Sequence, residues 1–252
     1  MPNWGARVEA APRVALKGEV LRLVESQEQV ATNQLVSSLE RQAVLEEMLE
    51  STKPPLRPGT ERLHYLLATP FRYPPLRHGS RFGRRHESSL FYGALGERTV
   101  LAEAAFYRFV FWYGMATPPP RKLDTQHTLF AARYQGCNGI RLHQPPFENA
   151  TSLLRHPADY NATQALGTAM REAGIDLFEY RSARDVEAGL NLALYNARPF
   201  TRKMPSRQDA WLCQLTADHV RFRRTGDGVL HEFTLGQFQF RGRLPLPATG
   251  GR

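Results

Sequence analysis

The chain has 252 residues, of which 42% are hydrophobic, and a formal net charge of +9. This length suits one large domain with a substantial core, and a basic surface favours polyanions such as nucleic acids or phosphorylated small molecules. The two cysteines show neither zinc spacing nor a disulfide framework. No apolar run reaches the about 20 residues of a membrane helix, and no secretory signal is visible. We therefore expect a cytoplasmic protein with no membrane association and no metal site.

The first sixty residues are predicted to form a helical arm. Apolar residues recur there at three- and four-residue steps with Gln, Glu and Ser between them, a pattern typical of amphipathic helix. The apolar positions are Val20, Leu23, Val24, Val30, Leu35, Leu39, Leu45, Met48 and Leu49. A proline-rich breaker at 53–59 ends the run. We place the arm at residues 1–60, where it could serve oligomerisation or regulation, or pack as a flap on the main domain at 61–252.

From residue 63 onward, short strands and helices alternate. Strands are predicted at residues 63–68, 89–92, 128–134, 139–143, 175–180 and 190–195. Helices are predicted at 99–113 and 161–173, the second ending at Gly174. Residues 211–223 and 229–233 flank the sequence TGDG, which is typical of a β-hairpin turn. This mixture predicts an α+β domain.

Several common catalytic motifs are missing from the sequence. No G-x-G-x-x-G follows a predicted strand and no G-x-x-x-x-G-K-[ST] occurs, so neither a Rossmann dinucleotide fold nor a P-loop NTPase is supported. The G-x-S-x-G elbow and the H-E-x-x-H motif are also missing. The usual hydrolase and metalloenzyme interpretations lose most of their support.

A basic, glycine-containing loop is the first candidate for a binding site. Residues 71–83, FRYPPLRHGSRFG, lie between two predicted strands. Guanidinium groups bind pyrophosphate bidentately, and glycines let the backbone approach a ligand closely. Taken alone, such a run is more often an ordinary solvated loop. Three further polar residues stand in apolar or strand-end contexts, namely Tyr92, Glu103 and Ser182.

Four short segments in this order resemble the signature of RES-domain proteins, a family named after an arginine, a glutamate and a serine. They are GSRF at 79–82, LFY at 90–92, LAE at 101–103 and YRSA at 180–183. The resemblance extends from about residue 63 to about residue 200 and implies a bacterial toxin with a mixed fold similar to ADP-ribosyltransferases. The N-terminal helical extension departs from compact RES toxins, as does the shorter gap between Arg72 and Arg81.

The resemblance also assigns roles by position. Arg81, Glu103 and Ser182 take the named catalytic roles, and Tyr92 matches the site tyrosine. Arg72 and Tyr73 match an arginine–aromatic pair at the end of the first strand. All six residues would bind NAD, with the arginines on its pyrophosphate and Ser182 on the nicotinamide ribose or amide.

The implied reaction consumes NAD by breaking the nicotinamide–ribose bond. The nucleophile would be inorganic phosphate, as a co-substrate, or water, and the sequence leaves this choice open. NAD would be the substrate, so the resemblance implies no true cofactor. It further implies an Xre-type antitoxin as a partner, and the N-terminal helices could form a homo-oligomer contact.

Other functions stay open beside this one. ADP-ribosyl transfer to a macromolecule would use the same residues, whereas an inactive RES scaffold would bind NAD, or nothing, and act through its helical arm. The net charge of +9, with Phe222 between Arg221 and Arg223, would also suit a nucleic-acid-binding protein. We do not expect nucleic acid as the partner, because the arginines are scattered and form no block.

Overall fold

The fold is built on one mixed sheet. The structure is a computed structural model that describes residues 2–26 and 38–246. Its eight strands follow the order β1-β2-β5-β4-β3-β6-β7-β8, and β1 also pairs with β3. They are β1 (Val14–Glu25), β2 (Phe91–Ala94), β3 (Leu123–Arg141), β4 (Leu177–Arg181), β5 (Leu190–Leu194), β6 (Arg207–Leu215), β7 (His219–Arg224) and β8 (Leu230–Thr234). The prediction of an α+β fold is confirmed.

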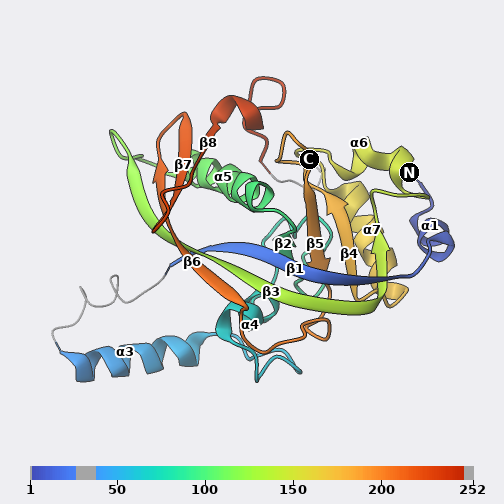
Figure 1. The fold of residues 1–252 in the computed structure, drawn as a ribbon, viewed down its shortest axis with the longest axis horizontal. Coiled ribbons are helices and arrows are strands. Elements are labelled where there is room, and N and C mark those ends of the chain that lie inside the picture. The colour runs from blue at the N-terminus through green and yellow to red at the C-terminus, as the bar shows by residue number, and fades with distance from the viewer. Residues whose placement is uncertain (1, 27–37, 247–252) are drawn as a thin grey trace.

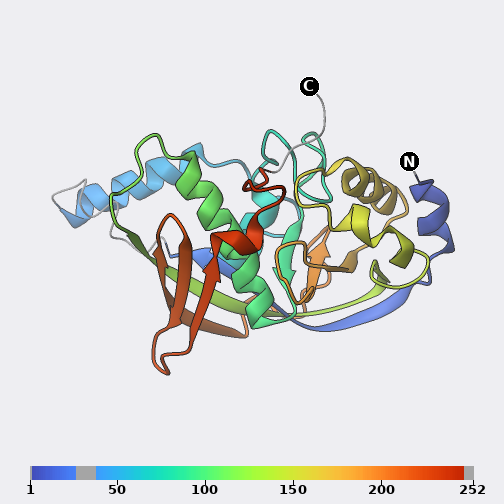
Figure 2. The same cartoon turned by 90° about the horizontal axis from the view of Figure 1, so that it is seen from above.

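The helices lie around two regions of this sheet, and the long strands β1 and β3 run through both (Figure 1). The helices are α1 (Trp4–Ala10), α3 (Leu39–Thr52), α4 (Tyr65–Arg72), α5 (Glu97–Gly114), α6 (Thr151–Leu154) and α7 (Asn161–Glu172), with short 3-10 helices η1 (Glu148–Ala150) and η2 (Leu235–Phe238). Figure 2 shows α5 beside β7 and β8, and α7 with α6 and α1 at the other end. None of the helices in the described ranges has the length and apolar character needed to cross a bilayer.

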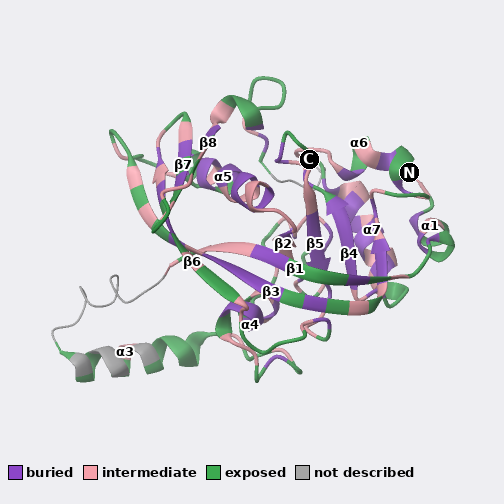
Figure 3. Cartoon of the chain, in the orientation of Figure 1, coloured by how far each residue is buried: buried purple, intermediate pink, exposed green. Residues whose placement is uncertain are grey.

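Three apolar clusters hold these elements together. The first packs α5, through Phe106 and Phe109, on Trp211, Phe222 and Phe233 of β6, β7 and β8. The second packs α7 and α1 on β4, and the third packs α4 on β1, β3 and β5. Burial follows this arrangement: β4, β5 and the inner faces of α5 and α7 are mostly buried, β1 and β6 alternate between buried and exposed residues, and the described residues of α3 are largely exposed (Figure 3). The largest aromatic side chains thus fix α5 against the sheet, where their buried area contributes most.

The helix predicted at Val20, Leu23 and Val24 is wrong, because residues 14–25 form β1. This strand pairs antiparallel with β3 from Val14↔Gly139 to Glu25↔His127. A short apolar run can match a helical or a strand period, and long-range pairing decides between them. Leu39, Leu45, Met48 and Leu49 lie in the helix α3, as predicted, while Val30 and Leu35 lie outside the described residues. The arm predicted for residues 1–60 therefore also supplies a strand to the main sheet.

Of the other helices and strands predicted from the sequence, the structure confirms some and contradicts one. The strand predicted at 63–68 is wrong, since α4 occupies 65–72 and the side chain of His64 accepts a hydrogen bond from the backbone N–H of Leu66 at its start. The helices at 99–113 and 161–173 are confirmed, with Gly174 at φ +70° after the second. Residues 128–134 and 139–143 belong largely to the single strand β3, and 211–223 divides into β6 and β7. The hairpin between β7 and β8 is confirmed.

Candidate active site

A pocket with a volume of about 500 Å³ lies between β1, β2, α5 and the loop after α4. Its lining includes Arg22, Tyr73, Arg81, Tyr92, Glu103, Tyr160 and Asn191. Four of the residues predicted from the sequence therefore share one cavity. Within the described part of the chain, neither Arg72 nor Ser182 lines this pocket.

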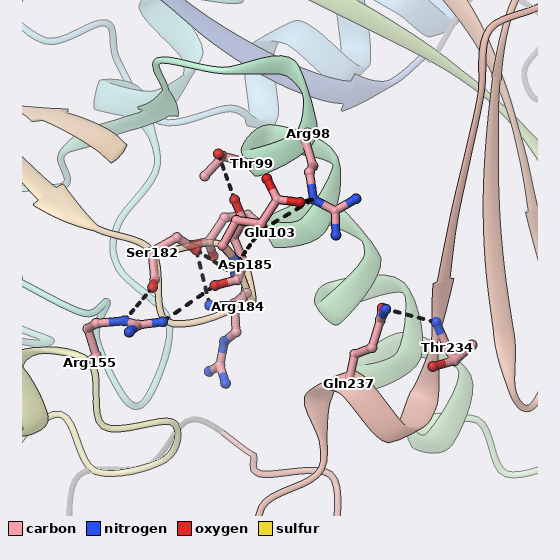
Figure 4. Close-up of polar contacts among 10 residues, drawn as sticks. Arg98, Thr99, Glu103, Arg155, Ser182, Arg184, Asp185, Thr234 and Gln237 are labelled. Atoms are coloured by element: carbon pink, nitrogen blue, oxygen red, sulfur yellow. Dashed lines mark hydrogen bonds and ion pairs between the residues drawn. The ribbon is translucent and has the colours of Figure 1, made fainter. Parts of the chain in front are cut away.

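Glu103 is the carboxylate of this pocket and is half-buried on the second turn of α5. Its Oε1 accepts a hydrogen bond from Ser182 Oγ at 2.6 Å and another from Asn191 Nδ2 at 2.7 Å. Figure 4 shows Glu103 on α5 and Ser182 after β4 pointing toward each other. Within residues 2–26 and 38–246, Oε2 has no hydrogen-bond partner. The carboxylate is thus fixed through one oxygen, and the other remains free for a substrate.

Ser182 acts on this site through Glu103. Its side chain is 0% exposed, and its Oγ accepts hydrogen bonds from the backbone N–H groups of Arg184 and Asp185, both at 3.0 Å. Because these two contacts occupy the acceptor side of the hydroxyl, its hydrogen points to Glu103. The hydroxyl of Ser182 is thus engaged in orienting the Glu103 carboxylate, and the predicted contact between Ser182 and NAD stays a prediction.

Arg81 presents a positive charge to the pocket. Its Nη1 donates to the carbonyls of Leu154 and His156 at 3.2 and 3.0 Å, and its guanidinium lies 4.6 Å from the ring centroid of Tyr160. No carboxylate pairs with Arg81 among the residues described. A fixed guanidinium without a counter-ion is well suited to a phosphate group.

Tyr92 connects the pocket wall to the glycine-containing loop. Its hydroxyl shares a hydrogen bond of 2.8 Å with Ser80 Oγ and accepts one of 3.1 Å from the backbone N–H of Phe82. Burial raises the pKa of Tyr92 to about 12, so the hydroxyl stays protonated at neutral pH. Tyr92 therefore holds the loop on either side of Arg81 as well as lining the cavity.

Arg22 is a pocket residue that the sequence did not reveal. It lies on β1, donates from Nη1 to the carbonyl of Tyr92 at 3.1 Å, and lies 5.3 Å from the ring centroid of Phe91. Burial lowers the pKa of Arg22 to about 10, so it keeps its charge at neutral pH. In the described ranges it pairs with no carboxylate. An arginine within the apolar run VLRLV was the available signal, and the assignment of that run to a helix hid it.

Arg72 is the one predicted arginine that the structure does not bring to the pocket. Its Nη1 lies 2.7 Å from Glu50 Oε1, and its Nε donates to the carbonyl of Pro54. Both contacts tie α4 to the end of α3. The structure therefore gives no support to the prediction that Arg72 holds a pyrophosphate, because its guanidinium binds Glu50 and Pro54 at the end of a helix, whereas Tyr73 enters the loop and lines the pocket.

Asn191 was also missed from the sequence. It is 2% exposed on β5, and its Nδ2 makes the second hydrogen bond to Glu103. A single polar residue in the apolar strand LNLAL was the only signal. The parts of the chain that the structure describes contain no group of three His, Cys, Asp or Glu side chains that could hold a metal ion.

Comparison with known proteins agrees with the resemblance seen in the sequence. A family model described as the RES domain matches residues 54–216, more than half of the 252 residues. Among solved structures, the crystal structure of the M. tuberculosis MbcT–MbcA toxin–antitoxin complex is similar at 11% sequence identity and a TM-score of 0.49, covering 81% of this chain and 90% of that chain. No curated protein matches the chain.

Proposed function

Because the chain belongs to the RES domain family, we propose that it is an enzyme that consumes NAD by cleaving the nicotinamide–ribose bond. One observation supports this most directly. Glu103 has one carboxylate oxygen held by Ser182 and Asn191, and it shares a pocket with the uncompensated arginines Arg22 and Arg81. A carboxylate for a sugar and guanidinium groups for a pyrophosphate are the two elements that this chemistry needs.

The carboxylate would act on the transition state. As the glycosidic bond breaks, its electron pair leaves with nicotinamide, which becomes neutral, and positive charge develops on the ribose. A negative Glu103 beside that sugar stabilises the developing charge more than the ground state, and this difference lowers the barrier. Carboxylates serve comparably in glycoside cleavage. An oxygen of phosphate or water then forms the new bond to the same ribose carbon. When the nucleophile is hydrogen phosphate or water, a proton is released to solvent.

The other pocket residues would orient the substrate. Arg81 and Arg22 would bind the pyrophosphate and hold the ribose against Glu103, which reduces the entropic part of the barrier. Tyr73 or Tyr92 would stack on the cationic nicotinamide ring, a contact worth roughly 0.5–2 kcal/mol. We further propose, from membership of the family, that the chain is a toxin neutralised by an Xre-type antitoxin.

Product analysis tests the proposal. Purified protein is incubated with NAD, with and without inorganic phosphate, and nicotinamide release is followed while mass spectrometry identifies the second product. ADP-ribose phosphate indicates phosphorolysis, ADP-ribose indicates hydrolysis, and label on a macromolecule indicates transfer. Glu103→Ala should abolish release, and undiminished turnover in this variant would exclude the mechanism.

A further inference from the structure

One face of α7 contacts the loop that contains Arg81. Four residues at helical spacing, Gln164, Gly167, Thr168 and Arg171, face the segment 78–88. Thr168 Oγ1 donates to Glu87 Oε1 at 2.6 Å and Arg171 Nη2 donates to the carbonyl of Ser88 at 2.8 Å. These two hold the far end of the segment, and Gln164 and Gly167 hold the end nearest the pocket.

Gln164 makes the densest of these contacts. Its side chain is 5% exposed, and its Nε2 lies 2.9 Å from the carbonyl oxygen of His78, 3.0 Å from that of Ser80 and 3.4 Å from that of Gly83. An amide nitrogen has two hydrogens, so they are shared among these acceptors. Gln164 therefore holds these three loop carbonyls on the side that faces α7, away from the pocket.

The loop backbone is shaped for this contact. Gly79 has a φ of +71°, and a Cβ at that position would lie 2.3 Å from the carbonyl oxygen of Gly83 and 2.7 Å from Gln164 Nε2. On α7, about one turn after Gln164, a Cβ at Gly167 would lie 1.9 Å from the carbonyl oxygen of Phe82. The loop thus rests directly on the backbone of α7, and glycine is required on both sides of the contact.

The same short segment is held from its opposite side by Tyr92, through Ser80 Oγ and the N–H of Phe82. Arg81 lies between these two residues. Its backbone is set by Gln164 and Tyr92, while its guanidinium is set by carbonyls of the segment before α7. The direction of Arg81 therefore depends on an amide that does not line the pocket.

We propose that Gln164 is a positioning residue that aims Arg81 at the diphosphate of a dinucleotide substrate by holding the carbonyls of residues 78, 80 and 83. The role rests on the proposed NAD-cleaving function. Gln164 touches no substrate atom in this scheme and acts through the backbone of the loop.

The test compares Gln164→Leu, which keeps the shape and removes the donors, with Thr168→Val. The control removes a hydrogen bond from the same helix to the same segment but leaves 78–83 untouched. We expect Gln164→Leu to raise KM for NAD about tenfold and to keep kcat within about threefold, since it weakens substrate binding and leaves Glu103 in place. Thr168→Val should leave both parameters near the wild-type values.

Gln164→Glu adds a readout that loss of stability alone would not produce. Its carboxylate would repel the three carbonyls, whereas its protonated form can donate one hydrogen bond to them. KM for NAD in this variant should therefore fall toward the wild-type value as the pH is lowered from 8 to 5, relative to the wild type at each pH.

Hydrogen exchange of the peptide covering residues 76–84 separates this inference from the proposed function, because it needs no turnover. Exchange should be faster in Gln164→Leu than in Thr168→Val. Equal exchange in the two variants would overturn the proposal, as would faster exchange with an unchanged KM. If the wild-type protein releases no nicotinamide, the proposed function fails, and the substrate-aiming role of Gln164 is overturned with it, whereas faster exchange would still show that Gln164 holds the loop.

Discussion

Ser182 Oγ and Glu103 Oε1 meet at 2.6 Å although 79 residues separate them in the chain. The serine is fully buried and the glutamate faces the pocket. The contact joins the end of β4 to the second turn of α5, so the orientation of the pocket carboxylate depends on the sheet. This arrangement predicts that the serine and the glutamate affect the same kinetic parameter.

Ser182→Ala should lower kcat for nicotinamide release by about 10- to 100-fold, the range expected for losing a hydrogen bond to a charged group. KM for NAD should change little, because Ser182 does not line the pocket in the described part of the chain. Steady-state kinetics of nicotinamide release measure both. Ser206→Ala is the matched control, since Ser206 Oγ donates to Glu19 in a similar pair on the exposed surface. A raised KM with an unchanged kcat would instead indicate that Ser182 contacts the substrate.

Arg22→Gln should raise KM for NAD by about 10- to 100-fold, because it would remove the charge-assisted contact to the pyrophosphate that we propose for this arginine. Arg72→Gln should leave KM unchanged, since its guanidinium binds Glu50 and the Pro54 carbonyl. Isothermal titration of NAD into Glu103→Gln carrying each change gives the affinity without turnover. Equal losses in the two variants would contradict the assignment of the two arginines.

The sequence predicts those helices and strands that local patterns of residues determine. The helical period fixes α5 and α7, so Glu103 is placed on the correct helix from sequence alone. The apolar run at β1 fits either period, and only its pairing with β3 makes it a strand. Because this run was assigned to a helix, Arg22 was missed as a pocket residue. Gln164 has no local signature, and Asn191 has only its polarity within the apolar strand LNLAL, because the roles of both arise from contacts with residues more than eighty positions away.

Gly167→Ala should destabilise the protein by about 1–3 kcal/mol, as expected when an added methyl group has no room. A Cβ there would lie 1.9 Å from the carbonyl oxygen of Phe82, and the loop cannot yield without moving Arg81. Gly114→Ala is the control, because it lies at the end of α5 with no atom within 4 Å of an added Cβ. That variant should be neutral or slightly stabilising, since alanine favours helix. Urea unfolding gives both values, and equal stability of the two variants would show that the α7–loop contact is looser than described.

His127 makes the stability of the fold sensitive to acid. The side chain is 4% exposed between β1 and α5, and burial, reinforced by the charge of Arg108, lowers its pKa to about 4 from the ordinary value of 6.5. Between these two values the unfolded chain binds a proton that the folded chain does not, so stability falls as the pH drops from about 6.5 toward 4. The full loss, reached below pH 4, is about 3 kcal/mol, because each pH unit between the two pKa values contributes about 1.4 kcal/mol.

His127→Gln should remove most of this dependence, and the exposed His86→Gln should keep it. The free energy of unfolding in urea, measured from pH 7 to pH 4.5, distinguishes the two. The carboxylates add their own acid dependence in every variant, so the difference between His127→Gln and the wild type is the quantity to compare. Parallel pH profiles for these two proteins would mean that His127 is protonated in the folded state without cost, and that the cluster of Glu25, Arg108 and His127 binds the added charge.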